Sequence, residues 1–441
     1  MQGASTFWRS SKTHLPDIGI LCALGFLFFF GAFWKYFDLR SNAWLYSDAS
    51  RYECYAHGFW QGVAGLHQFS KTQCGFLLPF TSTQPLHTLP REYPLLVLLP
   101  FTLALVAPLS LYHVAFACLM TVLMAVVYFV LKYKRTRGAA VAFLVYLLLG
   151  CVSTAVGRFD LLPSLLTLLA VLCAEKTRWR WAFALLALAT MTKFYPLILV
   201  PPFLIAQQMD SKAGWRSLQR FAPLGVFVFV CSALLLFSLS LNIDGTLAPL
   251  SYFKDRPIQI ESLSASILWL LSVSGRYGLT YTFDFGSHNV SSALAAPVAL
   301  GGTLLLITGL LYIWWLQVRG KVRLPLAAIL TLLVVMVTGK VFSPQYLLWV
   351  APLIAYVGGT NWRWLVGWGS VSVVTTIIYP FLYEPKYFAF LHFPPLDVTV
   401  FIRNVLLLLF VLVLLYLATQ GRIVQERPGS DKPAIHNEKY A

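Results

Sequence analysis

Charged residues stand directly beside long apolar segments at several points of this sequence. In chain order they are Asp48 and Glu53, Arg158 and Asp160 of "GRFDLLPS", Lys193 of "TKFYPL", and Arg256 and Glu261 of "YFKDRPIQIES". A charge that faces lipid costs about 2.5–3.5 kcal/mol on insertion scales, so ionisable residues at membrane depth are candidates for function. We expect these residues, with the stretch "GKVFSPQYLLW", to share one polar cavity, where a carboxylate can accept a proton and cations can hold an anion.

Asp48 also has a purely structural interpretation. Aspartate is a preferred N-cap, and a helix over about 49–61 would begin directly after it. Ser50 and Glu53, however, have the spacing of a capping box of their own, so capping does not require Asp48. The residues alone leave both roles open.

The other charged residues have structural alternatives as well. Arg158 and Asp160 could pair with each other. Lys193 could extend from a helix end toward water, as long cationic side chains do near a membrane. Arg256 and Glu261 could form a solvated pair in a loop. Each of these alternatives stays open beside the functional one.

The composition indicates which elements must position these residues. Of the 441 residues, 58% are hydrophobic and only 11% are charged, whereas a soluble protein has roughly 25% charged residues. The net charge of +16 lies between apolar segments, as in the loops of membrane proteins, which argues against a nucleic-acid binder. The sequence therefore predicts an all-α polytopic membrane protein.

Twelve apolar segments are predicted to span the bilayer. They cover about 16–37, 111–133, 139–156, 160–175, 179–192, 194–209, 221–241, 293–317, 324–340, 345–359, 363–381 and 398–418. Both termini are then cytoplasmic, because the basic clusters "KYKRTR", "KTRWR" and "RGKVR" fall on that side. No small-residue cleavage site follows the first segment, so we expect it to be retained.

Two further apolar segments, 93–110 and 262–275, are predicted not to span. Counting the first as a span would place the cluster "KYKRTR" outside. We expect both to be shallow or re-entrant segments packed on protein. The predicted membrane domain is then 1–420, with a helical first external loop at 38–110. The polar tail 421–441 is predicted to be disordered.

Cys54 and Cys74 lie together in the first external loop, on the oxidising side, where disulfides persist. A bridge closing a loop of this size would stabilise the fold by about 3 kcal/mol in the chain-entropy model, and it would hold the Asp48 helix against the strand-like stretch "TQCGFLLPF". The alternative is two reduced thiols that never meet. The seven cysteines show no metal-ligand spacing such as C-x-x-C, so no metal site is predicted.

Several stretches, in this order, resemble those of the multi-spanning glycosyltransferases of the GT-C superfamily, and in particular glycosyltransferase family 87, the polyprenyl-phosphate-mannose type. The resemblance runs from Asp48 to about Pro352. It is carried by "SDASRY", "REYPLL", "GRFDLLPSLLTLLA", "LATMTKFYPLILVPP", "DRPIQIES" and "SPQYLLWVAPL". Each piece is short, and their order along one face of the membrane makes the resemblance specific.

The resemblance implies a GT-C-like bundle, a lipid-linked sugar donor and a catalytic carboxylate in the first external loop. Asp48 is the matching position, and it would remove the proton of the acceptor hydroxyl. Arg256, Lys193 and Arg158 would hold the donor phosphate. The implied reaction is an inverting transfer of a hexose, mannose by expectation, from polyprenyl phosphate. It needs no cofactor, and the sequence is silent on a metal.

Further substrate contacts are expected from residues near the same cavity, namely Asp160, Glu261, Tyr52, Gln345 and Tyr346. The aromatic residues among them could instead belong to an interfacial belt. Mannosyltransferases of this family carry a W-x-H-H element where this chain has Ser343, Pro344, Gln345 and Tyr346. No histidine role can therefore be carried over to that position.

Two other functions are compatible with such a bundle: a transporter or flippase of an anionic lipid-linked substrate, and a non-catalytic subunit of an envelope-assembly complex. Transporters often show internal repeats and charges near the midplane. This sequence has no repeat of fixed period, and its charges gather at one leaflet, which favours the enzyme. The expected partners are a polyprenyl-phosphate sugar, a lipid or glycan acceptor and membrane lipids. The expected location is a bacterial plasma membrane, with the site facing outside.

Overall fold

The computed structural model describes residues 17–22, 24–25, 48–211, 214, 217–383 and 394–421. Most of the predicted first span, 16–37, lies outside the described residues. The same is true of positions 38–47 of the predicted external loop and of the predicted tail beyond residue 421.

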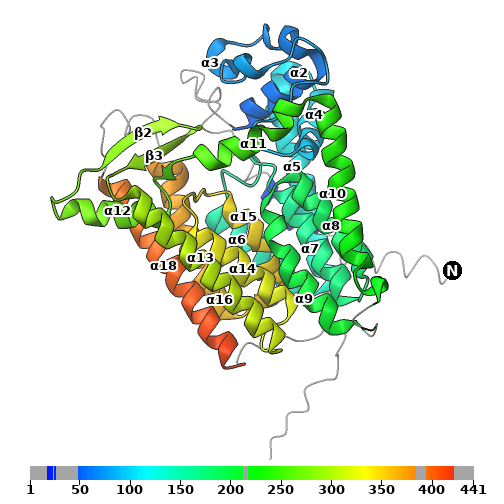
Figure 1. The fold of residues 1–441 in the computed structure, drawn as a ribbon, viewed down its shortest axis with the longest axis vertical. Helices are drawn as coiled ribbons and strands as arrows, with labels where there is room; N and C mark the ends of the chain where they lie inside the picture. The colour runs from blue at the N-terminus through cyan, green and yellow to red at the C-terminus, as the bar shows by residue number, and fades with distance from the viewer. Residues whose placement is uncertain are drawn as a thin grey trace, which may run out of the picture.

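Long helices form the body of the protein (Figure 1). They are α5 (Tyr112–Lys134), α6 (Arg137–Gly150), α7 (Leu161–Glu175), α8 (Trp179–Thr192), α9 (Val200–Asp210), α10 (Ala222–Leu241), α13 (Ala295–Val318), α14 (Leu324–Thr338), α15 (Tyr346–Gly358), α16 (Trp362–Thr376) and α18 (Pro394–Thr419). Their runs of leucine, alanine and valine favour helix, and polar or proline residues stand at most of their starts. Thr136, for example, caps α6 by accepting a hydrogen bond from the backbone N–H of Ala139 at 3.0 Å.

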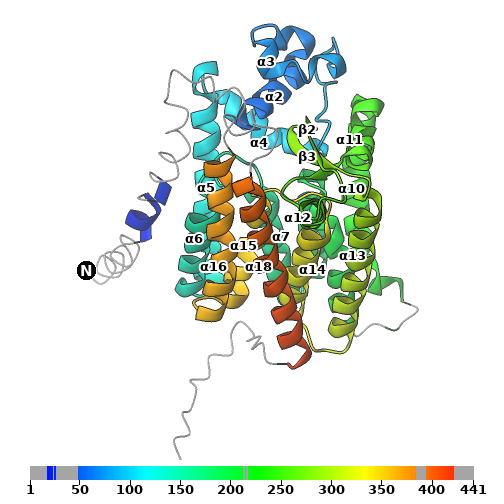
Figure 2. The same cartoon turned by 90° about the vertical axis from the view of Figure 1, so that its left-hand side faces the viewer.

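A layer of short elements covers one end of this bundle, and the two views agree on its place (Figures 1 and 2). Its helices are α2 (Asp48–Leu66), α3 (Lys71–Cys74), α4 (Leu98–Leu103), α11 (Ile243–Asp255) and α12 (Leu263–Val273). Its strands β1 (Ile258–Gln259), β2 (Thr280–Asp284) and β3 (Ser287–Ser291) form an antiparallel sheet in the order β1-β3-β2. The sequence analysis did not anticipate this small sheet.

Short helical turns connect these elements. The 3₁₀ turns are Leu78–Phe80, Leu95–Val97, Ala104–Val106, Leu109–Leu111, Tyr195–Leu199 and Leu218–Arg220, and a π turn spans Ile377–Leu382. In the described part of the chain, five helical segments are long and apolar enough to cross a membrane, namely Leu109–Lys134, Ala222–Leu241, Ala295–Val318, Trp362–Leu382 and Pro394–Thr419. The structure is thus that of a helical membrane protein, and the count of twelve spans stays a prediction.

The two apolar segments that were expected not to span are broken into short pieces. Leu95–Val106 is a shorter apolar helix, about 18 Å long at 1.5 Å per residue, and α12 has 11 residues. A bilayer core is about 30 Å thick, so neither piece can cross it as a single helix.

Helix α2 carries the first of the predicted site residues and differs from expectation at its start. It begins at Asp48 and kinks at Gly62, whose φ is +61°. The predicted capping box of Ser50 and Glu53 is wrong, because both side chains are buried in tertiary contacts. Ser50 Oγ lies 2.9 Å from His113 Nε2, and Glu53 accepts a hydrogen bond from Gln73 at 3.0 Å.

A disulfide joins Cys54 of α2 to Cys74 of α3, with their Cα atoms 5.6 Å apart. The stretch predicted as strand-like, "TQCGFLLPF", is helical instead. It contains most of α3 and the 3₁₀ turn Leu78–Phe80. Ser70 starts α3 by accepting a hydrogen bond from the N–H of Gln73, a local cap that an extended chain would lose.

The basic cluster lies at one end of the bundle and the layer of short elements at the other, and this difference predicts the orientation of the protein in the membrane. The link from α5 to α6 carries the basic cluster, and α11 ends at Asp255 in the opposite layer. In a background without free cysteines, we expect Arg135→Cys to react with a membrane-impermeant maleimide only from the cytoplasm and Asp255→Cys only from outside. External labelling at position 135 would overturn this orientation.

Burial of Glu53 should make the stability depend on pH. Burial raises the pKa of Glu53 from 4.5 to about 7, and the hydrogen bond from Gln73 opposes it. Between these two values the unfolded chain releases the proton while the folded chain keeps it, so stability falls as pH rises and levels off above about 7. The loss is about 3 kcal/mol at most. The thermal unfolding temperature in detergent should therefore fall less steeply between pH 5 and 8 in Glu53→Gln than in the wild type. Equal slopes in both proteins would contradict this.

Candidate active site

A polar cavity of about 450 Å³ opens between the end of the bundle and the layer of short elements. Its size suits a small-molecule ligand. Of the predicted site residues, Asp48, Arg158, Lys193, Arg256, Glu261, Gln345 and Tyr346 all line it. They come from α2, from the links before α7 and after α8, from the segment after α11, and from the start of α15. The sequence therefore predicted correctly that these distant segments share one cavity.

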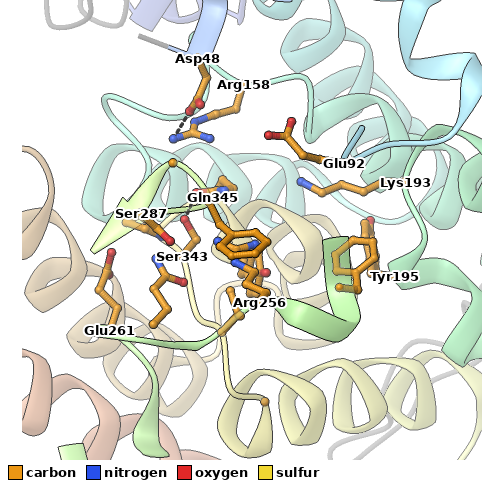
Figure 3. A pocket seen from close by; sticks show the side chains of 18 of the residues that line it. Asp48, Glu92, Arg158, Lys193, Tyr195, Arg256, Glu261, Ser287, Ser343 and Gln345 are labelled. Atoms are coloured by element: carbon orange, nitrogen blue, oxygen red, sulfur yellow. Dashed lines mark hydrogen bonds and ion pairs between the residues drawn. The ribbon is translucent and has the colours of Figure 1, made fainter. Parts of the chain in front are cut away.

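Asp48 pairs with Arg158 across the cavity mouth (Figure 3). Arg158 Nη2 contacts Asp48 Oδ2, and the two side chains are 19% and 18% exposed. The alternative in which Arg158 pairs with Asp160 is wrong. Residue 158 lies in the irregular link before α7, and its side chain reaches α2 instead. Asp48 is therefore held in place and still accessible from the cavity.

Asp160 lies behind the cavity wall and connects two parts of it. Its side chain is only 1% exposed, and Oδ1 accepts hydrogen bonds from Lys193 Nζ and from Trp349 Nε1, each at 2.6 Å. Lys193 therefore does not extend to water from its helix end, as one alternative had it. Its ammonium lines the cavity and lies 4.9 Å from the ring of Phe159.

Three stacked aromatic rings form one wall of the cavity. Tyr195 stacks on Trp349 with ring centroids 4.2 Å apart, and Tyr346 stacks on the same indole at 3.7 Å. All three residues line the cavity. Because Asp160 holds the indole nitrogen of Trp349, this wall has a fixed orientation, and its rings can pack on an apolar sugar face or an isoprenoid unit.

Two cations of the cavity, Arg256 and Lys340, form no ion pair with a carboxylate among the residues that the structure describes. Nε of Arg256 is buried without a hydrogen-bond partner, and the guanidinium lies 5.7 Å from the ring of Tyr252. Lys340 donates to the backbone carbonyl of Lys254 at 3.2 Å, and the carboxylate of Asp255 is near enough to favour its charged form. The alternative in which Arg256 and Glu261 form a solvated pair is wrong, because Glu261 is buried and lies 3.6 Å from Arg403.

Two residues that the sequence analysis did not single out also line the cavity as a pair. Glu92 is buried, accepts a hydrogen bond from Tyr55 Oη at 3.1 Å and pairs with Arg51 of α2. A signal was present, because Glu92 lies in the quoted stretch "REYPLL", directly before a long apolar run. An ionisable residue so placed is a functional candidate by the argument applied to the others.

Tyr52 is not a cavity residue, and its expected substrate contact is not supported. Its side chain is 1% exposed and stacks on Phe101 with ring centroids 4.2 Å apart. Phe116 and Phe159 pack around the same ring. In this cluster Tyr52 anchors α2 to the bundle and so fixes the helix that carries Asp48.

The stretch that departs from the W-x-H-H element does line the cavity. Ser343, Pro344, Gln345 and Tyr346 are all at its wall, and Ser343 donates a hydrogen bond to Gln345 Oε1. Neutral hydrogen-bonding groups and a phenol therefore line this part of the cavity. Within the described ranges, no three His, Cys, Asp or Glu side chains come close enough together to hold a metal ion.

Comparison with protein families identifies the class. The model of glycosyltransferase family 87 matches residues 93–344 of this chain. This match covers more than half of the sequence, so the chain belongs to that family and is a membrane-embedded glycosyltransferase. Among curated proteins, no significant match was found.

Removing the charge of Asp160 should destabilise the protein through its buried partner. Asp160→Asn leaves Lys193 buried without a counter-charge, which costs about 3–5 kcal/mol for comparable pairs. We expect a clear fall in the thermal unfolding temperature in detergent, partly restored in Asp160→Asn combined with Lys193→Met. Asp210→Asn, on the exposed end of α9, is the matched control. A single Asp160→Asn variant as stable as this control would contradict the buried pair.

Proposed function

We propose that this protein transfers a hexose, with mannose as the first candidate, from a polyprenyl-phosphate donor to a lipid or glycan acceptor on the external face of the membrane. The observation that supports it best is the arrangement of charges in the cavity. A carboxylate, Asp48, lies in the same cavity as two cations, Arg256 and Lys340, that form no ion pair with any residue the structure describes. A base and an anion-binding group are the two parts that this transfer needs.

A second, apolar cavity supports a lipid-linked donor. It has a volume of about 250 Å³, lies between α8, α10 and the segment around Leu89–Leu95, and shares Tyr93 and Phe194 with the polar cavity. Helix α10 is long and apolar enough to cross a membrane, and only 11% of its most apolar stretch is buried inside the protein. A donor with a long isoprenoid tail could thus remain in the bilayer while its phosphate reaches Arg256.

In the proposed reaction, the acceptor hydroxyl attacks the anomeric carbon of the sugar. Asp48 takes the proton of this hydroxyl, a new C–O bond forms at the anomeric carbon, and the bond to the phosphate oxygen breaks. Polyprenyl phosphate leaves with the electron pair of that bond, and Arg256 and Lys340 stabilise the negative charge it gains. A single displacement of this kind inverts the anomeric configuration.

Arg158 has a different role in this proposal from the one its charge first suggests. It already contacts Oδ2 of Asp48, so it orients the base and leaves Oδ1 for the acceptor proton. Lys193 is likewise neutralised by Asp160. The cations assigned to the phosphate are therefore Arg256 and Lys340, while Arg158 and Lys193 shape the walls on either side of it.

Asp48→Asn should abolish transfer without unfolding the protein. Asparagine keeps the size of the side chain and can still contact Arg158, but it cannot take the proton. In reconstituted vesicles with radiolabelled polyprenyl-phosphate mannose and a membrane-lipid extract as acceptor source, we expect at least about a 10²-fold loss of transfer. The unfolding temperature should change little. Turnover near that of the wild type would remove Asp48 from the mechanism.

Variants of Arg256 should show whether this residue contacts the donor phosphate or is only a solvated charge. We expect Arg256→Ala to raise the KM for the donor more than Arg256→Lys does, because lysine keeps the charge and loses only the forked geometry. Arg276→Ala, at an exposed position outside the cavity, is the matched control. Equally mild effects of both Arg256 variants would show that the phosphate binds elsewhere.

A further inference from the structure

A further cavity lies between α16 and α18, the orange and red helices of Figure 2. This groove has a volume of about 580 Å³, and most of its lining comes from the first half of α16 and the second half of α18. Tyr281 of β2 donates a hydrogen bond at 3.1 Å to Asp397, near the start of α18. The second half of α18 therefore lies away from the layer of short elements, and the groove is separate from the active site.

The walls of the groove are apolar, and close packing of the two helices forms its floor. Phe410 of α18 packs edge-on against Trp364 of α16, with ring centroids 5.9 Å apart. Gly367 allows this approach, because a Cβ there would lie 2.7 Å from Cδ2 of Phe410. Val366 and Val413 also line the groove, and their side chains are exposed. An exposed apolar groove on a membrane helix pair can hold hydrocarbon chains.

One end of the groove is polar and cationic. It is formed by the stretch "NWRW", residues 361–364, at the start of α16. The guanidinium of Arg363 lies 5.8 Å from the ring of Trp362, and it forms no ion pair with any residue in the described part of the chain. None of the residues that line the groove is acidic. This end therefore carries a positive charge that an anion can balance.

The cationic end lies on the side of the membrane that is predicted to be cytoplasmic. Arg135, in the basic cluster "KYKRTR", donates a hydrogen bond at 3.2 Å to the carbonyl of Tyr356, directly before Val357 of the groove. Basic pockets between membrane helices on this side bind anionic lipid head groups. The donor of the proposed reaction brings its phosphate to the opposite end of the bundle, so the groove is oriented for a different lipid.

We propose that the groove between α16 and α18 binds a diacyl phospholipid with an anionic head group from the cytoplasmic leaflet. The lipid phosphate binds Arg363, and the acyl chains lie along the apolar walls past Val366 and Val413. The positive charge at one end and the apolar surface along the rest match the two parts of such a lipid. Because the lipid contacts both helices, its binding stabilises the folded protein.

Native mass spectrometry of the full-length protein can compare two lipids with the same chains, dioleoylphosphatidylglycerol and dioleoylphosphatidylcholine. We expect the wild type to retain the anionic phosphatidylglycerol preferentially. Arg363→Ala should lower its binding about fivefold, the effect of one cation near an anionic lipid, and should leave phosphatidylcholine binding unchanged. Arg319→Ala is the matched control, because Arg319 is also exposed and lies 5.6 Å from a tryptophan ring, that of Trp315, outside the groove.

Filling the groove tests the binding of the acyl chains. Val413→Trp should lower the binding of both lipids, whereas Leu412→Trp, at an equally exposed position outside the groove, should not. The comparison of Arg363→Ala with Arg319→Ala decides the question even if Val413→Trp fails to fold. Equal binding of both lipids by the wild type, or equal losses in the two arginine variants, would overturn the proposal. Binding of polyprenyl phosphate that Arg363→Ala abolishes would also overturn it, because the groove would then hold that lipid instead.

Discussion

The buried carboxylate of Asp160 is the interaction on which the site depends. It is fully enclosed, and it binds the ammonium that follows α8 and the indole of α15 through the same oxygen. A charge without a partner at this depth would cost several kcal/mol, so the three elements must meet at this point. The stack of Tyr195, Trp349 and Tyr346 then has a fixed place, and the polar cavity opens beside it.

The cost of burying an unpaired charge also explains how the remaining charges of the cavity are arranged. Opposite charges that can meet are paired: Asp48 with Arg158, and Glu92 with Arg51. Arg256 and Lys340 form no ion pair with a carboxylate among the described residues. The cavity thus has a neutral region around the proposed base and a positive region for an anion. In the proposed mechanism, the phosphate of the donor would bind in this positive region and balance its charge.

The shared cavity could be predicted from the sequence because the free-energy cost of exposing a charge to lipid does not depend on the detailed geometry of the fold. Charges beside apolar runs must avoid lipid, and the order of the runs places them at one end. The ion pairs within the cavity could not be predicted from the sequence, because they depend on the backbone conformation of the irregular links between helices. Arg158 is two positions from Asp160 and more than a hundred from Asp48, yet it pairs with Asp48. Tyr52 was misassigned for a similar reason, because nothing local shows which face of α2 meets the bundle.

Two features could have been recognised from sequence. Arg403 lies inside the predicted span 398–418, and a buried arginine there signals a polar partner, which is Glu261. The stretch "TYTFDFGSHNVS" alternates apolar and polar residues around Phe285 and Gly286, as a hairpin does. The most direct test of the account is a cryo-EM structure with a non-hydrolysable polyprenyl-phosphonate mannose analogue. The account predicts the phosphonate between Arg256 and Lys340, with the anomeric carbon facing Asp48. A phosphonate bound outside this cavity, or a sugar turned away from Asp48, would contradict it.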